Sequence, residues 1–173
     1  LRPENIYTSW WGNIALKTTP EGVYDLNTGK EILTVEQVNK CLNEKVAFSA
    51  HSFSFPLSEE PVVMFTKGQR RIMLDFHACR VLYDVTLPKG AVTHDFNINS
   101  RQTAYTIGGN LYVFTANSDT LEISMDGSTD GSDNIVYGQS VHRDEFGISG
   151  GTFWSPDGKS LAYYRMDQSM VPS

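Results

Sequence analysis

Two adjacent carboxylates, Asp144 and Glu145, are the residues whose types and spacing best suit binding chemistry in this sequence. They stand between apolar residues in the stretch 141–147, with Arg143 beside them. Neighbouring like charges raise each other's energy unless a cation is supplied. Two interpretations follow. The pair is either a solvated acidic turn partnered by Arg143, or an anionic site for a ligand cation such as a protonated amine.

A second pattern, Gly-x-Ser-x-Gly at residues 147–151, matches the nucleophile elbow of hydrolases. That elbow needs a strand before the serine and a helix after it, whereas a turn of the type Ser-Pro-Asp-Gly follows here at 155–158. In the hydrolase fold the base histidine also follows the serine. All four histidines of this chain precede Ser149: His51, His77, His94 and His142. We therefore predict that Ser149 lies in a Gly-rich bend and is not a catalytic nucleophile.

No metal or cofactor site is predicted. The histidines lack the i, i+4 helical spacing of a zinc site. The acidic run 126–133 resembles a calcium loop but lacks a glutamate at its twelfth position and flanking helices, so we predict a polar loop between sheets. Cys41 and Cys79 have no CxxC spacing, and two free buried thiols are the simplest interpretation. A single disulfide, which would suit an oxidising compartment, is the alternative.

Composition excludes several classes of protein. The chain has 173 residues with 14 Lys and Arg against 20 Asp and Glu, a net charge of −6 and no basic cluster, which argues against a nucleic-acid surface. Its 40% hydrophobic content can form a core. No apolar run approaches the ~18 residues of a membrane span. The sequence starts at Leu1 without a basic and apolar leader, so we expect any signal peptide to have been removed.

Strand signals dominate the elements that must position these residues. Short β-branched or aromatic runs bounded by turn residues predict strands at 45–50, 61–66, 72–76, 80–85, 103–107, 111–115, 120–124 and 161–165. The tripeptide 108–110, Gly-Gly-Asn, predicts a hairpin. One helix is expected after Thr34, which can cap it with Gln37 and place Val35, Val38 and Leu42 on one face. The fold class is therefore all-β with one short helix.

An internal repeat indicates how the strands are organised. Residues 96–105 align without a gap with 154–163, each reading aromatic, polar turn and a strand opening on Ala-Tyr, and a fainter copy lies near 43–48. A turn and inner strand that recur in this way are typical of β-propeller blades, although hairpins of a β-sandwich are the alternative. At about 57 residues per unit the chain holds about three four-stranded antiparallel blades, and closed propellers have at least four. We expect residues 1–173 to be part of a larger propeller whose chain continues past Ser173.

These residues resemble a known family. The run 137–147, which contains the acid pair, and the run 151–167 are similar to the N-terminal propeller of the dipeptidyl peptidase IV family, and to its secreted bacterial prolyl tripeptidyl members. The resemblance is specific over 92–171 and diffuse over 1–88. It implies an eight-bladed propeller joined to a C-terminal α/β-hydrolase domain, which holds the Ser-Asp-His triad and which this chain lacks.

The resemblance also assigns roles to residues. A double-acid motif of the family binds the free α-amine of the substrate, and Asp144 and Glu145 stand at its two positions; the first is Asp where the family usually has Glu. A propeller arginine of the family holds a substrate carbonyl. Arg70 and Arg71, expected in a turn between two strands, are the nearest candidates, and we assign this role to Arg71.

The function that the resemblance implies is substrate gating and amine binding in a secreted or periplasmic serine exopeptidase. Such an enzyme releases dipeptides or tripeptides, preferably after proline. The implied partners are a peptide with a free N-terminus, the hydrolase domain of the same protein and a second copy in a homodimer. A non-enzymatic periplasmic propeller that binds protein partners is the alternative. It would have no need for Asp144 and Glu145 to face a cavity.

Overall fold

The structure is a computed structural model that describes residues 7–117, 119–129, 134–140 and 150–170. Its strands are antiparallel throughout, and the described residues include one α-helix of eight residues. The chain divides into two compact units, Leu1–Thr86 and Leu87–Ser173, and each is described by itself. The predicted fold class, all-β with one short helix, is confirmed.

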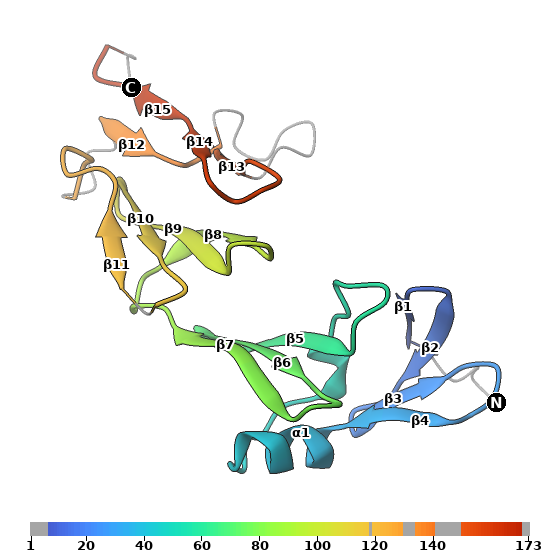
Figure 1. The fold of residues 1–173 in the computed structure, drawn as a ribbon. Helices are drawn as coiled ribbons and strands as arrows, with labels where there is room; N and C mark the ends of the chain where they lie inside the picture. The colour runs from blue at the N-terminus through green and yellow to red at the C-terminus, as the bar shows by residue number, and fades with distance from the viewer. Residues whose placement is uncertain (1–6, 118, 130–133, 141–149, 171–173) are drawn as a thin grey trace, which may run out of the picture. The chain divides into compact units, whose positions relative to one another are not determined.

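The first unit begins with a four-stranded meander in which each strand pairs with the next along the chain (Figure 1). Its strands are β1 (Tyr7–Trp11), β2 (Ile14–Thr18), β3 (Gly22–Asp25) and β4 (Glu31–Thr34). Leu16, Val23 and Leu33 are buried on one face of this sheet and belong to the core of the first unit. The sequence analysis predicted none of these four strands.

Helix α1 (Val35–Leu42) begins as predicted. The Thr34 side chain accepts a hydrogen bond from the Gln37 amide at 3.2 Å, and the Gln37 side chain accepts one from the Thr34 amide at 2.9 Å. This reciprocal pair satisfies two backbone donors that a helix start leaves unpaired. Asn43 ends the helix in the left-handed conformation, with φ of 53°. Val38 is buried in the core of the unit, and Val35 and Leu42 pack against it.

The segment after the helix corrects two predictions. Residues 45–49 form no strand, so the strand expected at 45–50 and the faint third repeat at 43–48 are both wrong. The cause is a side chain of the helix. Asn39 donates to the Val46 carbonyl at 3.2 Å and accepts from the Val46 amide at 2.9 Å, so it replaces a neighbouring strand. A 3₁₀ turn, η1 (Ala50–Ser52), follows.

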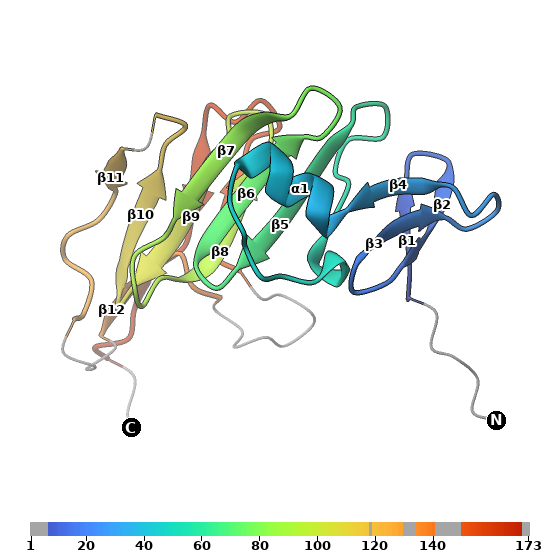
Figure 2. The same ribbon diagram turned by 90° about the horizontal axis from the view of Figure 1, so that it is seen from below.

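The second sheet of this unit has three strands, β5 (Val62–Lys67), β6 (Arg70–Asp75) and β7 (Arg80–Thr86), in sequence order. Ser54 adds an isolated bridge to Met64 of β5. Phe65, Ile72 and Leu74 are buried in the same core as Val38, and α1 lies across this face of the sheet (Figures 1 and 2). The core of the first unit therefore lies between its two sheets and its helix.

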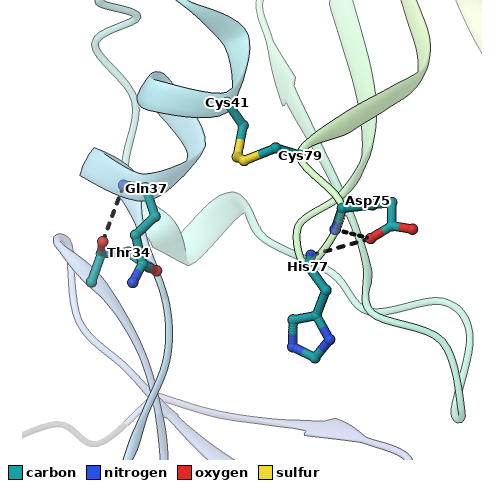
Figure 3. Close-up of a disulfide and its surroundings, with 7 residues drawn as sticks. Thr34, Gln37, Cys41, Asp75, His77 and Cys79 are labelled. Carbon is teal, nitrogen blue, oxygen red and sulfur yellow. Dashed lines mark hydrogen bonds between the residues drawn. A yellow bond between two sulfur atoms is a disulfide. The ribbon is translucent and has the colours of Figure 1, made fainter.

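A disulfide between Cys41 and Cys79 joins α1 to the turn between β6 and β7 (Figure 3). The prediction of two free thiols is therefore wrong, and the alternative of a single disulfide is confirmed. The turn itself is organised by Asp75, whose carboxylate accepts hydrogen bonds from the amides of His77 and Ala78 at 3.1 and 2.9 Å. Cys79 has a φ of 50°, a left-handed conformation that is uncommon for residues with a Cβ.

The second unit opens with a four-stranded sheet in the order β11-β10-β9-β8. Its strands are β8 (Val92–Asn97), β9 (Gln102–Ile107), β10 (Asn110–Phe114) and β11 (Thr120–Glu122). The hairpin predicted at 108–110 is confirmed, because Ile107 pairs with Asn110 and Gly108 has a φ of 58°. Tyr105 packs with Leu87 and Ala91 on one face, while Ala104, Leu111 and Val113 form a cluster with Tyr137 on the other.

The described residues of this unit also form two short strand pairs. β12 (Ile135–Tyr137) pairs with β15 (Arg165–Asp167), and β13 (Thr152–Trp154) pairs with β14 (Leu161–Tyr163). The repeat of 58 residues is preserved in the register. Phe96 faces Thr103 in one hairpin, and Trp154 faces Leu161 at the equivalent place in the other.

The two copies of the repeat also contact each other. Asp95 accepts hydrogen bonds from the Thr152 hydroxyl at 3.0 Å and from the Trp154 indole at 3.2 Å. The side-chain amides of Asn97 and Asn99 donate to the Ser155 and Pro156 carbonyls at 3.2 and 2.7 Å. Consecutive copies are thus bound side by side through their turns. Of the three four-stranded sheets expected, the described residues form two, together with the three-stranded sheet and the two short pairs.

Candidate functional site

Arg70 and Arg71 are the first two residues of β6 and do not lie in the turn, which is confined to Gly68 and Gln69. Successive side chains of a strand point to opposite faces of its sheet. The two guanidinium groups therefore lie on different faces and serve different purposes.

Arg70 is fully engaged by two carboxylates. Its Nε and Nη2 atoms donate to Asp84 at 2.8 and 2.7 Å, and its Nη1 and Nη2 atoms donate to Glu44 at 2.9 and 2.8 Å. These hydrogen bonds, that of Asp84 above all, raise the pKa of Arg70. The same contact holds the pKa of Glu44 below its ordinary value. Arg70 therefore connects β6, β7 and the end of α1, and it is not a candidate for binding substrate.

Arg71 has a different environment. Its side chain is half-buried, and burial lowers its pKa, with the nearby Tyr83 hydroxyl acting in the opposite direction. Arg71 makes no hydrogen bond or ion pair with another residue in the part of the chain that the structure describes. A half-buried cation without a counter-ion is costly, and such groups concentrate at binding sites. In the part of the chain that the structure describes, Arg70 is thus held by two carboxylates and Arg71 by none.

The other residues singled out in the sequence, His142, Asp144, Glu145 and Ser149, lie outside the described residues. The two ends of the segment that carries them are described. The amide of Gly138 donates to the carbonyl of Tyr164 at 2.9 Å, and the amide of Tyr164 donates to the carbonyl of Gly151 at 2.8 Å. Both ends are thus bound to one residue. We call Gly138, Gly151 and Tyr164 the stem of the segment 139–150.

A polar cluster next to the stem escaped the sequence analysis. The Tyr137 hydroxyl donates to Asp126 at 2.6 Å and accepts from Arg165 Nε at 3.0 Å. The hydrogen bond from Tyr137 is the main reason why the pKa of Asp126 is lowered and that of Tyr137 is raised. Because Asp126 is engaged in this way, it ties the loop after β11 to β12 and β15. The sequence gave no signal for Tyr137 and Arg165, because their pairing depends on the register of β12 and β15.

The described histidines and the described part of the acidic run make contacts or connections within the fold. His51 contacts the Tyr7 ring, His77 contacts the rings of Trp11 and Phe76, and a ring nitrogen of His94 lies 2.9 Å from the Ala91 carbonyl. The described part of the acidic run 126–133 connects β11 to β12, as predicted for a loop between sheets. Within the described ranges, no group of three or more His, Cys, Asp or Glu side chains could hold a metal ion.

Comparison with known proteins gives a consistent result. The sequence-family model of the dipeptidyl peptidase IV (DPP IV) N-terminal region matches residues 75–173, more than half of the chain. Proteins assigned as dipeptidyl-aminopeptidase B are 35% identical over 94 residues in Talaromyces stipitatus and 34% identical over 90 residues in Talaromyces marneffei. These matches cover 51% and 49% of this chain and 10% of each fungal protein.

Solved structures extend the similarity to the whole chain. A Bacteroides ovatus protein assigned as a dipeptidyl aminopeptidase IV has a TM-score of 0.80 and 36% identity, over 98% of this chain and 24% of that protein. Porphyromonas gingivalis dipeptidyl peptidase 4 has a TM-score of 0.52 at 16% identity over 96% of this chain and 26% of its own, which shows a shared fold. The chain thus spans about a tenth of the fungal relatives and about a quarter of the bacterial ones. It belongs to the family of the dipeptidyl peptidase IV N-terminal region.

Proposed function

We propose that this chain binds the N-terminal amine of a peptide substrate for a serine exopeptidase, through Asp144 and Glu145. The observation that carries the proposal is the family match over residues 75–173, which includes the acid pair. An α-amine has a pKa of ~8 and is mostly charged at neutral pH, so it needs an anionic partner. Charge-assisted hydrogen bonds to two carboxylates provide one.

Anchoring the amine also sets what the enzyme releases. A fixed distance from the amine to the reacting serine admits a fixed number of residues, which makes the enzyme an exopeptidase. Arg71, which no carboxylate holds in the described part of the chain, is proposed to hold a substrate carbonyl. The serine, its base and the pocket for proline belong to a hydrolase domain elsewhere in the same protein, where an acyl-enzyme forms. Release after proline, as a dipeptide or a tripeptide, is part of this proposal.

The architecture that we propose is a portion of a larger propeller. The repeat supports it, because Asp95 and Ala104 lie on the face of their sheet that meets the next copy. Their equivalents 58 residues later, Phe153 and Ala162, are exposed. Phe153 is 47% exposed and packs edge-on against Tyr164, which is 40% exposed. A further sheet of the same protein is proposed to cover this aromatic face.

We propose a secreted or periplasmic location, with a homodimer as the assembly. The Cys41–Cys79 disulfide supports such a location, because disulfides persist in oxidising compartments. Within the described ranges, no helix is long and apolar enough to cross a membrane.

The test uses the full-length protein that contains this chain. Release of a chromophore is compared between free-amine Xaa-Pro and Xaa-Xaa-Pro reporters and their N-acetylated forms. The comparison is repeated in Glu145→Ala and in Glu59→Ala, an exposed glutamate that serves as the control. We expect acetylation and Glu145→Ala each to lower kcat/KM at least tenfold, roughly the worth of a charged hydrogen bond, and Glu59→Ala to have no effect.

Other outcomes decide against parts of the proposal. No cleavage of any reporter would favour the non-enzymatic scaffold. Cleavage that is indifferent to both acetylation and Glu145→Ala would keep the peptidase and remove the acid pair from substrate binding. Arg80, whose side chain is 71% exposed, provides the control for Arg71. If Arg71→Ala and Arg80→Ala have the same kcat/KM, Arg71 does not hold the substrate carbonyl.

A further inference from the structure

The two cysteines of the disulfide differ in their exposure to solvent. Cys79 is the last residue of the turn 76–79 between β6 and β7 and is exposed (Figure 3). Cys41 is half-buried on α1 and packs against the core of the first unit. Thiol–disulfide exchange begins when a thiolate attacks one sulfur of the bond, so its rate depends on access to that sulfur. Cys79 is therefore the cysteine that an attacking thiolate reaches first.

The turn that carries Cys79 is held by contacts other than the disulfide. The Asp75 carboxylate accepts hydrogen bonds from two backbone amides of the turn. The amide of Phe76 donates to the Pro61 carbonyl at 2.9 Å, and the Phe76 ring is buried in the core of the unit. These contacts involve neither sulfur, so the turn keeps its place when the bond between the sulfurs is broken.

The helix that carries Cys41 is also held by other contacts. Val38 is fully buried beneath α1, and Arg70 of β6 donates two hydrogen bonds to Glu44, just past the end of the helix, at 2.9 and 2.8 Å. The Cα atoms of the two cysteines lie 4.9 Å apart, within the range of disulfides that need no backbone movement. Because both segments are held separately, the two thiols of the reduced protein stay close enough to pair again.

We propose that the Cys41–Cys79 disulfide is a site of reversible thiol–disulfide exchange, at which a low-molecular-weight thiol attacks Cys79 and releases Cys41. In the oxidising compartment proposed for this protein the bond is the resting state. Exchange removes the covalent tie between α1 and the hairpin and leaves the other contacts of both in place. The inference goes beyond the proposed function and depends on neither the acid pair nor Arg71.

The exchange balances in two steps. The thiolate of the small thiol forms a bond to Sγ of Cys79, the bond between the two cysteines breaks, and Cys41 leaves as a thiolate that takes up a proton. A second thiolate then attacks the mixed disulfide and releases Cys79, which is protonated in turn. Two small thiols are thereby oxidised to their disulfide, and the protein gains two electrons and two protons. Attack of Cys41 on the mixed disulfide reverses the first step and expels the small thiol.

The matched variants Cys41→Ser and Cys79→Ser measure access to each sulfur in the full-length protein. Each variant loses the same disulfide and keeps one of the two thiols. Both are treated with oxidised glutathione, and the adduct on each cysteine is followed by mass spectrometry of its peptide. We expect Cys79 to form the adduct at least about tenfold faster than Cys41 in the folded protein, and the two rates to agree within about twofold in denaturant. Equal rates in the folded protein, or faster reaction of Cys41, would overturn the assignment of Cys79.

Reversibility is tested on the parent protein with reduced glutathione, which is afterwards removed by gel filtration. We expect the disulfide to open at a rate that does not change with urea below the unfolding transition. It should re-form at least about tenfold faster in buffer than in denaturant, because the fold holds the two thiols together. Asp75→Ala, which loosens the turn, should slow re-formation, with Glu59→Ala as the control. Opening that accelerates with urea in step with unfolding, or re-formation at the same rate in buffer and denaturant, would refute exchange in the folded protein.

Discussion

Loss of the Cys41–Cys79 disulfide should destabilise the first unit by about 4 kcal/mol. The bond joins residues that are 38 apart in sequence. Cross-linking a loop of that length removes about 13 cal/mol/K of entropy from the unfolded chain, and this entropy corresponds to about 4 kcal/mol at 298 K. The loop contains β5 and β6, so the effect should extend over the sheet on which α1 packs.

Hydrogen exchange of the backbone amides in α1, β6 and β7 measures this effect, because exchange reports the free energy of local opening. We expect exchange in a Cys41→Ser/Cys79→Ser variant of the full-length protein to be about 700-fold faster than in the oxidised parent, since about 1.4 kcal/mol is a factor of ten. Amides of β9 and β10 in the second unit serve as the internal control and should exchange at the parent rate.

A second variant separates the effect of losing the cross-link from the effect of backbone strain at Cys79. Cys79 has a φ of 50°, which costs a residue with a Cβ about 1 kcal/mol and costs glycine little. Cys41→Ser/Cys79→Gly should therefore recover about 1 kcal/mol of the loss and exchange about fivefold more slowly than the double serine variant. Equal exchange in the oxidised parent and both variants would refute the entropy argument. Equal exchange in the two variants would refute the strain argument.

Three further predictions concern single contacts. Thr34→Ala should lower the free energy of unfolding by about 1 kcal/mol through loss of the helix cap, measured by urea denaturation with Thr34→Ser as the control. Glu44, whose pKa is lowered by Arg70, contributes stability that is present above its unfolded pKa and is lost as pH falls through its folded pKa. Stability measured from pH 7 to pH 2 should therefore fall less steeply in Glu44→Gln. Gly158→Ala should cost at least about 1 kcal/mol more than Gly29→Ala in thermal unfolding. Both glycines have positive φ, but only at Gly158 would a Cβ meet another residue, Ser100, at 2.5 Å.

Features that depend on a few neighbouring residues could be predicted from the sequence. The helix cap at Thr34 and the hairpin at Gly108 are encoded by residues three or fewer positions apart, and both are confirmed. The strands of the first sheet were missed because each has only four or five residues and polar ones interrupt it, as in Gly22–Asp25. Their burial comes from packing against distant elements. The disulfide was only the alternative to two free thiols for the same reason, since only the folded chain brings α1 to the turn at Cys79.

The same distinction between local patterns and contacts of distant residues applies to the candidate site. Arg70 and Arg71 are identical neighbours in sequence, and what separates them is the pairing of Arg70 with Asp84 and Glu44, which lie 14 and 26 residues away. The acid pair stands out by residue type alone and stays a prediction. The backbone contacts of Tyr164 with Gly138 and Gly151, by contrast, join residues 26 and 13 positions apart, so no local pattern could indicate them.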